Sequence, residues 1–117
     1  MTIASNGVIS GDFNDTSDIT LKKNIVPLED STEKVKKLNP VTFDWEDTGL
    51  GSIGFIAQEI EELYPDAVNG EEGKKSIKIS CIVAALTKTV QSLIEKNEVL
   101  DKRIKELEKK SQWKYLY

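Results

Sequence analysis

The sequence predicts an α+β protein in which a small mixed head of short strands and helices precedes one long C-terminal helix. Two observations predict this fold. Apolar residues recur in a heptad pattern from residue 79 onwards, and no Gly or Pro interrupts residues 80–112. Between residues 17 and 79, short strand and helix patterns alternate and are separated by Gly and Pro. We therefore divide the 117 residues into segments 1–16, 17–79, 80–112 and 113–117.

The composition excludes several classes of function. The chain carries 16 basic and 20 acidic side chains, a formal net charge of −4, which argues against a nucleic-acid binder. Histidine is absent, which removes Ser-His-Asp and Cys-His catalysis and nearly every zinc site. The lone Cys81 cannot form an internal disulfide, no apolar stretch reaches the roughly 18 residues of a membrane span, and no signal-peptide pattern is present. We expect a soluble, acidic, cytosol-type domain without membrane contact, metal or cofactor.

The first part of the chain predicts short elements. Residues 1–16 combine Gly, Ser, Asn and Asp with few apolar side chains, which fits either short strand fragments or a flexible lead-in. Residues 17–27 predict an extended segment that ends at a proline. A short helix then begins at an Asp30 N-cap, with Glu33 as its capping-box partner, and closes at the Asn-Pro pair of residues 39–40.

The middle of the chain predicts a strand, a helix and a second strand. Val41, Phe43 and Trp45 alternate with polar residues, as in a half-buried strand. The apolar residues of segment 54–68 stand at helical spacing, and a proline at position 65 ends that run. Around them we expect a turn at 47–52, a polar loop at 69–75, a short strand at 76–79 and a helix N-cap at Ser80.

The heptad stripe of segment 80–112 predicts association between copies of the chain. A helix of about 33 residues would be about 50 Å long and could not fold back into so small a globule. Its apolar stripe therefore requires helices from other chains. Following Ile79 at a d position, the predicted association residues alternate between a and d: Val83, Leu86, Val90, Leu93, Asn97, Leu100, Ile104 and Leu107.

Charges beside the stripe favour a parallel arrangement. Lys96 and Asp101, like Arg103 and Glu108, are g and e′ residues of opposite sign five positions apart. Asn97 at an a position lowers stability and fixes the register. The β-branched a residues with Leu at d lean towards a dimer in simple zippers, a preference that the attached head could override. The alternative is a long amphipathic helix packed on its own domain.

A Ser-Lys pair offers the main route to catalysis without histidine. Ser17 and Lys22 lie five residues apart, and the lysine must be neutral, through burial, to accept the serine proton. Apolar neighbours at 19, 21, 25 and 26 could supply that environment. Residues at this spacing face each other on neither a straight helix nor a straight strand, so a working pair requires a bend. Lys23 could serve as the base instead.

Other polar clusters have simpler interpretations than chemistry. Asp44, Glu46 and Asp47 could bind calcium, but without a spaced ligand loop they fit a solvated strand edge and turn better. The glutamates at 59, 61 and 62 fit a wet helix face better than an acid-base set. The GLGSIG run at 49–54 lacks the lysine of a phosphate loop and predicts a turn. Cys81 fits a small apolar filler.

Three motifs in order carry a family resemblance. SDITLKKNI, then LNPVTFDW, then IGFIAQEIEELYPDAV, followed by the heptad helix, resemble the self-cleaving C-terminal intramolecular chaperone domain of phage tailspikes, tail fibres, neck appendages and endosialidases. The resemblance runs from about Asp12 to Lys110. The sequence departs from the pattern at Ile79, where many relatives carry an aromatic, and in the closing SQWKYLY, which could cap a helix bundle or form a disordered end.

The resemblance implies a function for each segment. Such domains are homotrimers that hold an upstream β-rich fibre of the same chain in register and then cut themselves off, so residues 1–16 would end that fibre and the long helix would form a parallel trimeric coiled coil. Ser17 would be the nucleophile and Lys22 the general base of a single-turnover serine endopeptidase. Residues expected to shape the site are Asp18 and Leu21 in the motif, and Gly54, Phe55, Gln58 and Glu59 near the cleavage segment. Localisation would be the host cytoplasm during virion assembly.

Geometry gives a preference for the bond that is cut. Attack of Ser17 on the carbonyl of Thr16 passes through a five-membered ring, whereas attack on its own carbonyl needs a four-membered one. We therefore favour the Thr16–Ser17 bond and keep Ser17–Asp18 as the alternative, because attack by a neighbouring chain removes this constraint. Two alternative functions stay open: a coiled-coil trimerisation tag without catalysis, and a receptor-binding tip, to which no sequence feature points.

Overall fold

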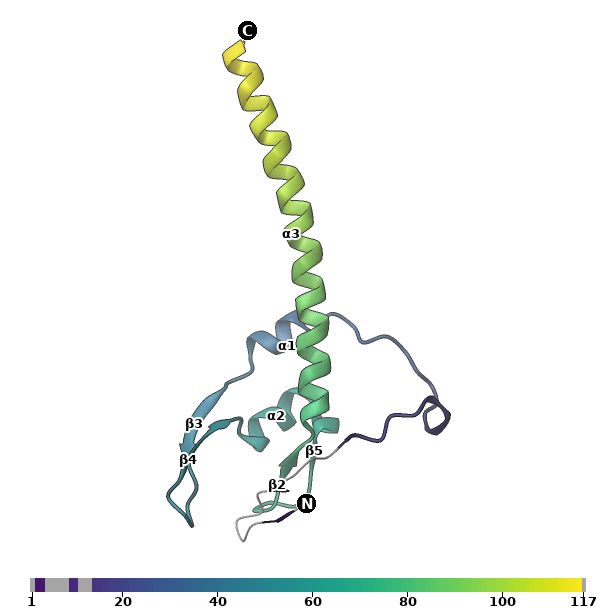
Figure 1. Cartoon of the computed structure of the whole chain (residues 1–117), viewed down its shortest axis with the longest axis vertical. Helices are drawn as coiled ribbons and strands as arrows, with labels where there is room; N and C mark the ends of the chain where they lie inside the picture. The colour runs from purple at the N-terminus through teal and green to yellow at the C-terminus, as the bar shows by residue number, and fades with distance from the viewer. Residues whose placement is uncertain (1, 4–8, 11–13, 117) are drawn as a thin grey trace.

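The chain forms a small head from which one long helix projects as a rod (Figure 1). This computed structural model describes residues 2–3, 9–10 and 14–116. The principal extents are 75 × 41 × 27 Å. The elements are, in chain order, β1 (Thr2–Ile3), β2 (Ile9–Ser10), η1 (Ile19–Leu21), α1 (Thr32–Lys36), β3 (Val41–Asp44), β4 (Gly51–Gly54), α2 (Ala57–Leu63), η2 (Pro65–Ala67), β5 (Val68–Asn69), β6 (Ser76–Ile77) and α3 (Ile79–Leu116).

The strands form three separate two-stranded antiparallel sheets. β1 pairs with β2, β3 with β4, and β5 with β6. The predicted alternation in β3 is confirmed, because its side chains are half-buried and exposed in turn. The turn predicted at 47–52 is too long: Gly51 and Ser52 already pair with Asp44 and Phe43. The reversal is shorter because Gly49 adopts a positive φ of 70°.

The two short helices differ from their predicted limits. α1 has Ser31, not Asp30, at its N-cap position, and no side-chain bond caps it. Asp30 instead accepts hydrogen bonds from the Thr32 backbone N–H and hydroxyl, at 3.1 and 2.7 Å. The capping box with Glu33 is therefore wrong; Glu33 pairs with Lys36 at 3.6 Å.

α2 covers only the central part of the segment predicted as helix. The prediction of 54–68 was too long at the N-terminal end because Gly54 pairs with Val41 in the sheet. At the other end Pro65 closes the helix as expected, and residues 65–67 form the 3₁₀ turn η2. Val68 then begins β5, the first strand of the hairpin whose polar tip was predicted as a loop.

The long helix is confirmed and extends further than predicted. α3 has 38 residues, so it is about 57 Å long. Ser80 lies inside it, not at its N-cap, and the helix continues through the predicted tail as far as Leu116. The proposed capping by the tail side chains lies outside the described residues. In the part of the chain that the structure describes, no helix is both long and apolar enough to cross a membrane.

The core of the head is a small cluster that holds the base of α3. Ile60 from α2, Ala67 and Val68 from the η2–β5 corner, and Ile82 from α3 are all buried. Half-buried side chains complete it: Leu38, Phe55, Ala57, Tyr64, Ile77 and Cys81. Cys81 thus sits at the edge of the core, in keeping with its interpretation as an apolar filler.

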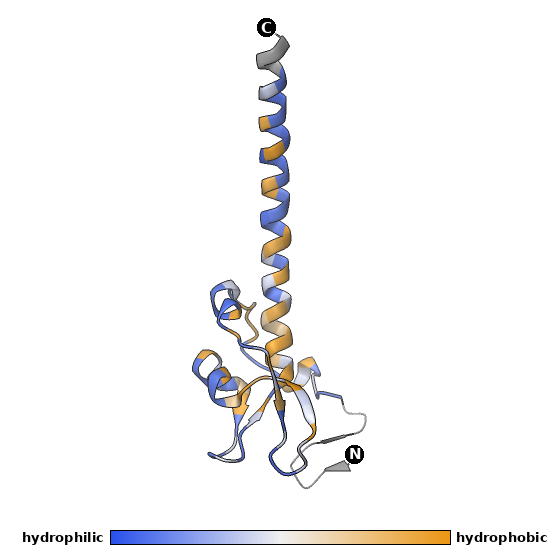
Figure 2. Ribbon diagram, turned by 90° about the vertical axis from the view of Figure 1, so that its left-hand side faces the viewer, coloured by the Kyte–Doolittle hydropathy of each residue, from blue (hydrophilic) through white to orange (hydrophobic). Residues whose placement is uncertain are grey.

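α3 presents one flank to the head and a different face to solvent. Ile82, Ala85 and Thr89 are buried at three- and four-residue spacing. The heptad stripe is exposed: Val83, Leu86, Val90, Leu93, Leu100, Ile104 and Leu107 retain 42–64% of their accessible surface. Apolar residues accordingly recur along the rod above the head (Figure 2). The alternative in which this stripe packs on its own domain is therefore wrong for the single chain.

Truncation of the buried core residue should destabilise the fold. Ile60 is 1% exposed. Ile60→Ala should lower the free energy of unfolding by about 2–4 kcal/mol, because it removes buried methyl groups and leaves a cavity. Urea denaturation at a fixed chain concentration measures this. Ile53, on β4, is 77% exposed, so Ile53→Ala should cost less than about 1 kcal/mol. Equal losses would contradict this description of the core.

Candidate active site

The structure brings Ser17 and Lys22 into direct contact. The Nζ atom of Lys22 donates a hydrogen bond of 2.6 Å to the Oγ atom of Ser17. The bend that this spacing requires is supplied by the 3₁₀ turn η1, after which Lys22 is extended again. Lys22, and not Lys23, is thus the amine placed at the serine.

Asp18 and Thr20 form the bend. Asp18 is the N-cap of η1, and its Oδ1 atom accepts hydrogen bonds from the Thr20 backbone N–H at 2.8 Å and the Thr20 hydroxyl at 2.6 Å. The Leu21 N–H donates to the Asp18 carbonyl at 3.1 Å, which closes the turn. The hydroxyl of Thr20, followed by its N–H, lowers the pKa of Asp18. The motif SDITLK therefore encodes its own turn, with Asp18 as the residue that organises it.

The Ser17–Lys22 pair lies on a segment that is exposed throughout. Residues 14–27, which we call the arm, lead from the N-terminal hairpin towards α1 and include no buried or half-buried residue. In Figure 1 the arm bows away from α3 on the side opposite α1, α2 and the β3–β4 hairpin. Four of its apolar side chains retain 64–78% of their accessible surface: Ile19, Leu21, Ile25 and Val26. The apolar wall expected around the lysine is therefore not formed within one chain.

The predicted site-shaping residues at 54–59 lie elsewhere in the single chain. Gly54 ends β4 and Phe55 packs at the edge of the core. The Gln58 amide donates to Glu72 at 3.0 Å, and Glu59 accepts from the Asn39 amide at 3.3 Å. Since η1 and α2 lie on opposite sides of α3 in Figure 1, the expected contact between this segment and the cleavage segment is not made within one chain.

The ion pair between Lys75 and Glu61 was not predicted from the sequence. Lys75 donates a 2.6 Å hydrogen bond to Glu61 and lies 3.7 Å from Glu72. The bond to Glu61 is the main cause that raises the pKa of Lys75. It ties the tip of the β5–β6 hairpin to α2, so Glu61 has a structural partner and does not belong to an acid-base set. No local signal pointed to it, because the two residues are 14 positions apart.

Among the residues that the structure describes, no group of three or more Asp, Glu, Cys or His side chains could hold a metal ion. The three acidic residues weighed for calcium, Asp44, Glu46 and Asp47, are exposed at the end of β3 and in the following turn. This arrangement agrees with the interpretation as a solvated strand edge.

A head with a Ser-Lys turn at its beginning and an exposed helical rod at its end is the arrangement expected from the resemblance to C-terminal chaperone domains of phage fibres. Comparison with known proteins supports this resemblance. Residues 17–69 match the model of a family described as chaperone of endosialidase. This family is named as a peptidase family, and the match confirms the resemblance carried by the three sequence motifs. The match begins at Ser17 itself.

The similar curated proteins are long phage fibre proteins. The chain is 35% identical over 99 residues to the long tail fiber protein Gp37 of Enterobacteria phage K3 and to that of Enterobacteria phage T2. These matches cover 80% of this chain but 8% and 7% of the relatives. The same protein of Escherichia phage AR1 is 31% identical over 74 residues. The chain thus spans less than a tenth of the length of these relatives.

The Asp18–Thr20 bond should be visible in a titration. Because its pKa lies below the ordinary value of 3.8, Asp18 stabilises the turn above that pH, and the stabilisation is lost as the pH falls through the lowered pKa. Thr20→Ala removes the hydroxyl donor and should raise the pKa of Asp18 towards 3.8, measured by carboxyl NMR. Asp30, which accepts the same pair of bonds from Thr32, should keep its pKa in this variant. A pKa of Asp18 unaffected by Thr20→Ala would contradict this description of the turn.

Proposed function

We propose that the chain is an intramolecular chaperone that assembles as a homotrimer, holds an upstream β-rich phage tail fibre in register, and then releases itself by autoproteolysis at Ser17. The observation that carries this proposal is the 2.6 Å hydrogen bond between Lys22 and Ser17, held by a turn that the motif itself encodes. The match of residues 17–69 to a chaperone family and the similarity to phage tail fibre proteins support it.

The proposed reaction uses only the chain and water. An uncharged Lys22 accepts the Ser17 hydroxyl proton while Oγ attacks the carbonyl carbon of Thr16 through a five-membered ring. The Thr16–Ser17 C–N bond breaks, and the Ser17 nitrogen leaves with the proton that the lysine returns. Water then hydrolyses the resulting ester, which gives a Thr16 carboxylate and a new N-terminus at Ser17. Attack on the Ser17–Asp18 bond by a serine of a neighbouring chain is the alternative.

The exposed arm links catalysis to assembly. A lysine accepts a proton only when it is neutral, and burial lowers the pKa of a lysine amine because a low dielectric disfavours its charge. In one chain the arm leaves the pair in water, so the single chain has the geometry for the reaction without the environment. We infer that neighbouring copies cover the apolar side chains of the arm and so activate the pair only after assembly.

The bare stripe of α3 supplies the trimerisation surface. Its exposed a and d residues cannot be covered by the head, which lies on a different flank of the helix. Asp101, proposed to meet Lys96 of another copy, pairs with Lys105 of its own helix at 2.9 Å. Both side chains are more than 60% exposed, so this pair is weak and can exchange for one between helices.

A removable trimeric clamp suits the folding of a β-rich fibre. Strand pairing between three chains is non-local and slow, whereas a coiled coil forms quickly from local contacts. Once three C-termini are joined, the strands just upstream experience a high effective concentration. Residues 1–16, with the β1–β2 hairpin, would be the last part of that fibre. Cleavage in the host cytoplasm during virion assembly then leaves the fibre kinetically trapped.

A non-catalytic trimerisation tag is the second candidate. The exposure of both Ser17 and Lys22 in the single chain favours it. The tag shares the trimer with the first proposal and differs only in cleavage, so cleavage decides between them.

Alanine at either member of the pair should abolish cleavage. When the chain is expressed with upstream fibre residues, Ser17→Ala should leave it uncut, and Lys22→Ala should slow cutting at least about 100-fold because the general base is lost. Denaturing gels measure the cut, and the first residue of the released fragment, Ser17 or Asp18, identifies the bond. Lys23→Ala is the matched control and should cut normally. Normal cutting of the Ser17 or Lys22 variant would end the assignment.

A charge in the stripe should dissociate the trimer. Leu93 occupies a d position and is half exposed in the single chain. Light scattering should report three chains for the wild type and one for Leu93→Asp, because three carboxylates would meet in an apolar seam. Gln91→Asp places the same charge at an outward b position and should preserve three chains. A monomeric wild type would remove the clamp mechanism.

A further inference from the structure

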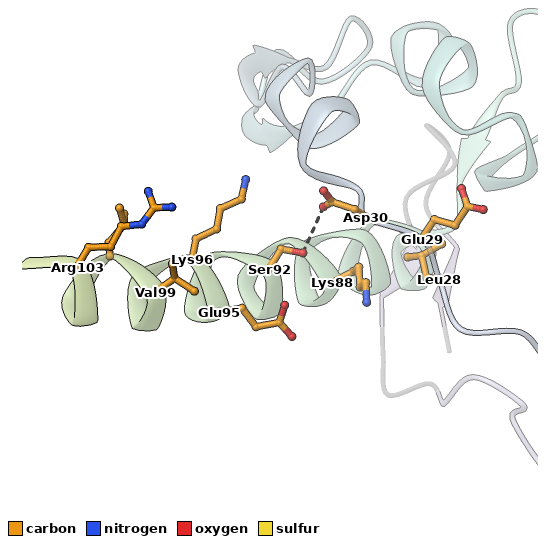
Figure 3. A pocket seen from close by; sticks show the side chains of 10 residues that line it. Leu28, Glu29, Asp30, Lys88, Ser92, Glu95, Lys96, Val99 and Arg103 are labelled. Carbon is orange, nitrogen blue, oxygen red and sulfur yellow. Dashed lines mark hydrogen bonds between the residues drawn. The ribbon is translucent and has the colours of Figure 1, made fainter. Parts of the chain in front are cut away.

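A groove lies where the chain crosses from the arm to α1. Residues 28–30, which we call the strap, lie across α3, and together they enclose a groove of about 640 Å³ (Figure 3). From the strap the groove is lined by Leu28 and Asp30, and from α3 by Ser92, Lys96, Val99 and Arg103 among others. The groove lies on the same flank of α3 that packs against the head nearer the start of the helix.

Hydrogen bonds hold the strap in place. The Ser92 hydroxyl donates to Asp30 at 3.2 Å, and the same carboxylate oxygen accepts both bonds from Thr32. Ser31 is buried at 3% exposure, and its hydroxyl donates to the Glu29 carbonyl at 3.1 Å. The groove is therefore built into the single chain and does not need a second copy to form.

The heptad positions indicate what the groove faces. Ser92 and Val99 are c residues, and Lys96 and Arg103 are g residues. In a parallel coiled coil the g side of one helix lies against the e side of the next. The e residues of this chain at the corresponding level are Ile94, Asp101 and Glu108.

The groove carries charges of both signs: Lys88, Lys96 and Arg103 line it together with Glu29, Asp30 and Glu95. Ile94 is 52% exposed although it lies outside the a/d stripe, and Leu28 and Val99 in the groove are 46% and 52% exposed. Lys96 and Arg103 hold the g positions of the groove, the side on which a parallel neighbour would place its acidic e residues, Asp101 and Glu108. The g residue in register with Ile94 is Thr89, which is 8% exposed. The g position opposite Ile94 is therefore already buried within its own chain.

We propose that the groove receives the e side of α3 from a second copy of this chain, with Ile94 of that copy against Leu28 and its two acidic residues against Lys96 and Arg103. This inference rests on the proposed parallel assembly and deepens it. Because the strap leads directly into the arm, the contact determines where the arm starts relative to the neighbouring copy. The cleavage segment is thus positioned only when the helices are paired in register.

Disulfide trapping between two copies tests the contact. Chains of two lengths, both carrying Cys81→Ser, are co-expressed, one with Leu28→Cys and the other with Ile94→Cys. Mild oxidation should give a disulfide between the long and the short chain, since the two side chains would approach within the few ångströms that a disulfide requires. Lys102→Cys, at an outward f position, replaces Ile94→Cys in the matched control and should give none.

Asn97→Cys separates failure of the contact from failure of the assembly. In a parallel trimer the Asn97 residues meet at the axis, so Asn97→Cys chains should link to one another whether or not the groove is used. Linking at 97 without linking between 28 and 94 would overturn the groove contact alone. No linking at 97 would overturn the parallel assembly and the groove contact with it.

A cleavage rate tests the coupling between the groove and the arm. Ile94→Ser should slow cleavage about tenfold while light scattering still reports three chains, because the a/d stripe is intact. Lys102→Ser should leave the rate unchanged. Cleavage of Ile94→Ser at the wild-type rate would overturn the coupling. Loss of the trimer in Ile94→Ser would show that Ile94 belongs to the assembly seam, and would overturn the separate role given to the groove.

Discussion

The packing of the head against one flank of α3 is the contact on which the rest of the structure depends. Ile60, Ala67 and Val68 hold Ile82, and burial continues through Ala85 to Thr89. Because this flank is not the heptad stripe, folding of the head leaves the stripe free. A helix of 38 residues extends far beyond its head, so most of its apolar surface has no partner in the same chain. The fold of one copy is thus arranged for association, because exposed apolar surface of this extent favours burial between copies.

The Ser17–Lys22 pair needs a local turn, which brings the two side chains together, and an apolar environment, which must come from elsewhere. The turn that joins Ser17 to Lys22 depends only on residues 17–22, above all on Asp18 and Thr20, so it forms in every copy independently. The apolar environment that would make an amine neutral cannot be supplied by so short a segment, and the arm finds none on its own head. In the proposed mechanism this separation protects the chain, because a copy that has not assembled keeps both Ser17 and Lys22 exposed to water and lacks the apolar environment that catalysis requires.

The sequence predicts this protein best where the signal is periodic or local. The heptads of α3 and the alternation in β3 depend on residues close in sequence, and both were predictable. The Asp-x-Thr pattern that bends the chain at Asp18 recurs at Asp30, where the aspartate accepts the same pair of hydrogen bonds from a threonine. The sequence therefore carries a signal for both turns, although at Asp30 it also fits a capping box. The start of α2 and the Lys75–Glu61 pair were not predictable, because each depends on a partner strand or helix more than ten residues away.

The strap connects α3 to the arm. Through it, we infer, association of the helices can affect the position of the cleavage segment. The arm is anchored at its C-terminal end, where Asp30 meets Ser92, the fourteenth of the 38 residues of α3. In the proposed contact, a displacement at that level would act on the arm through Asp30. In the proposed coiled coil, pairing that reaches Ser92 would cover the seam from Val83 to Leu93, about one and a half heptads. In the proposed mechanism, the arm is thus anchored above the base of the helix, so its position would follow the pairing of the helices and cleavage would come after assembly.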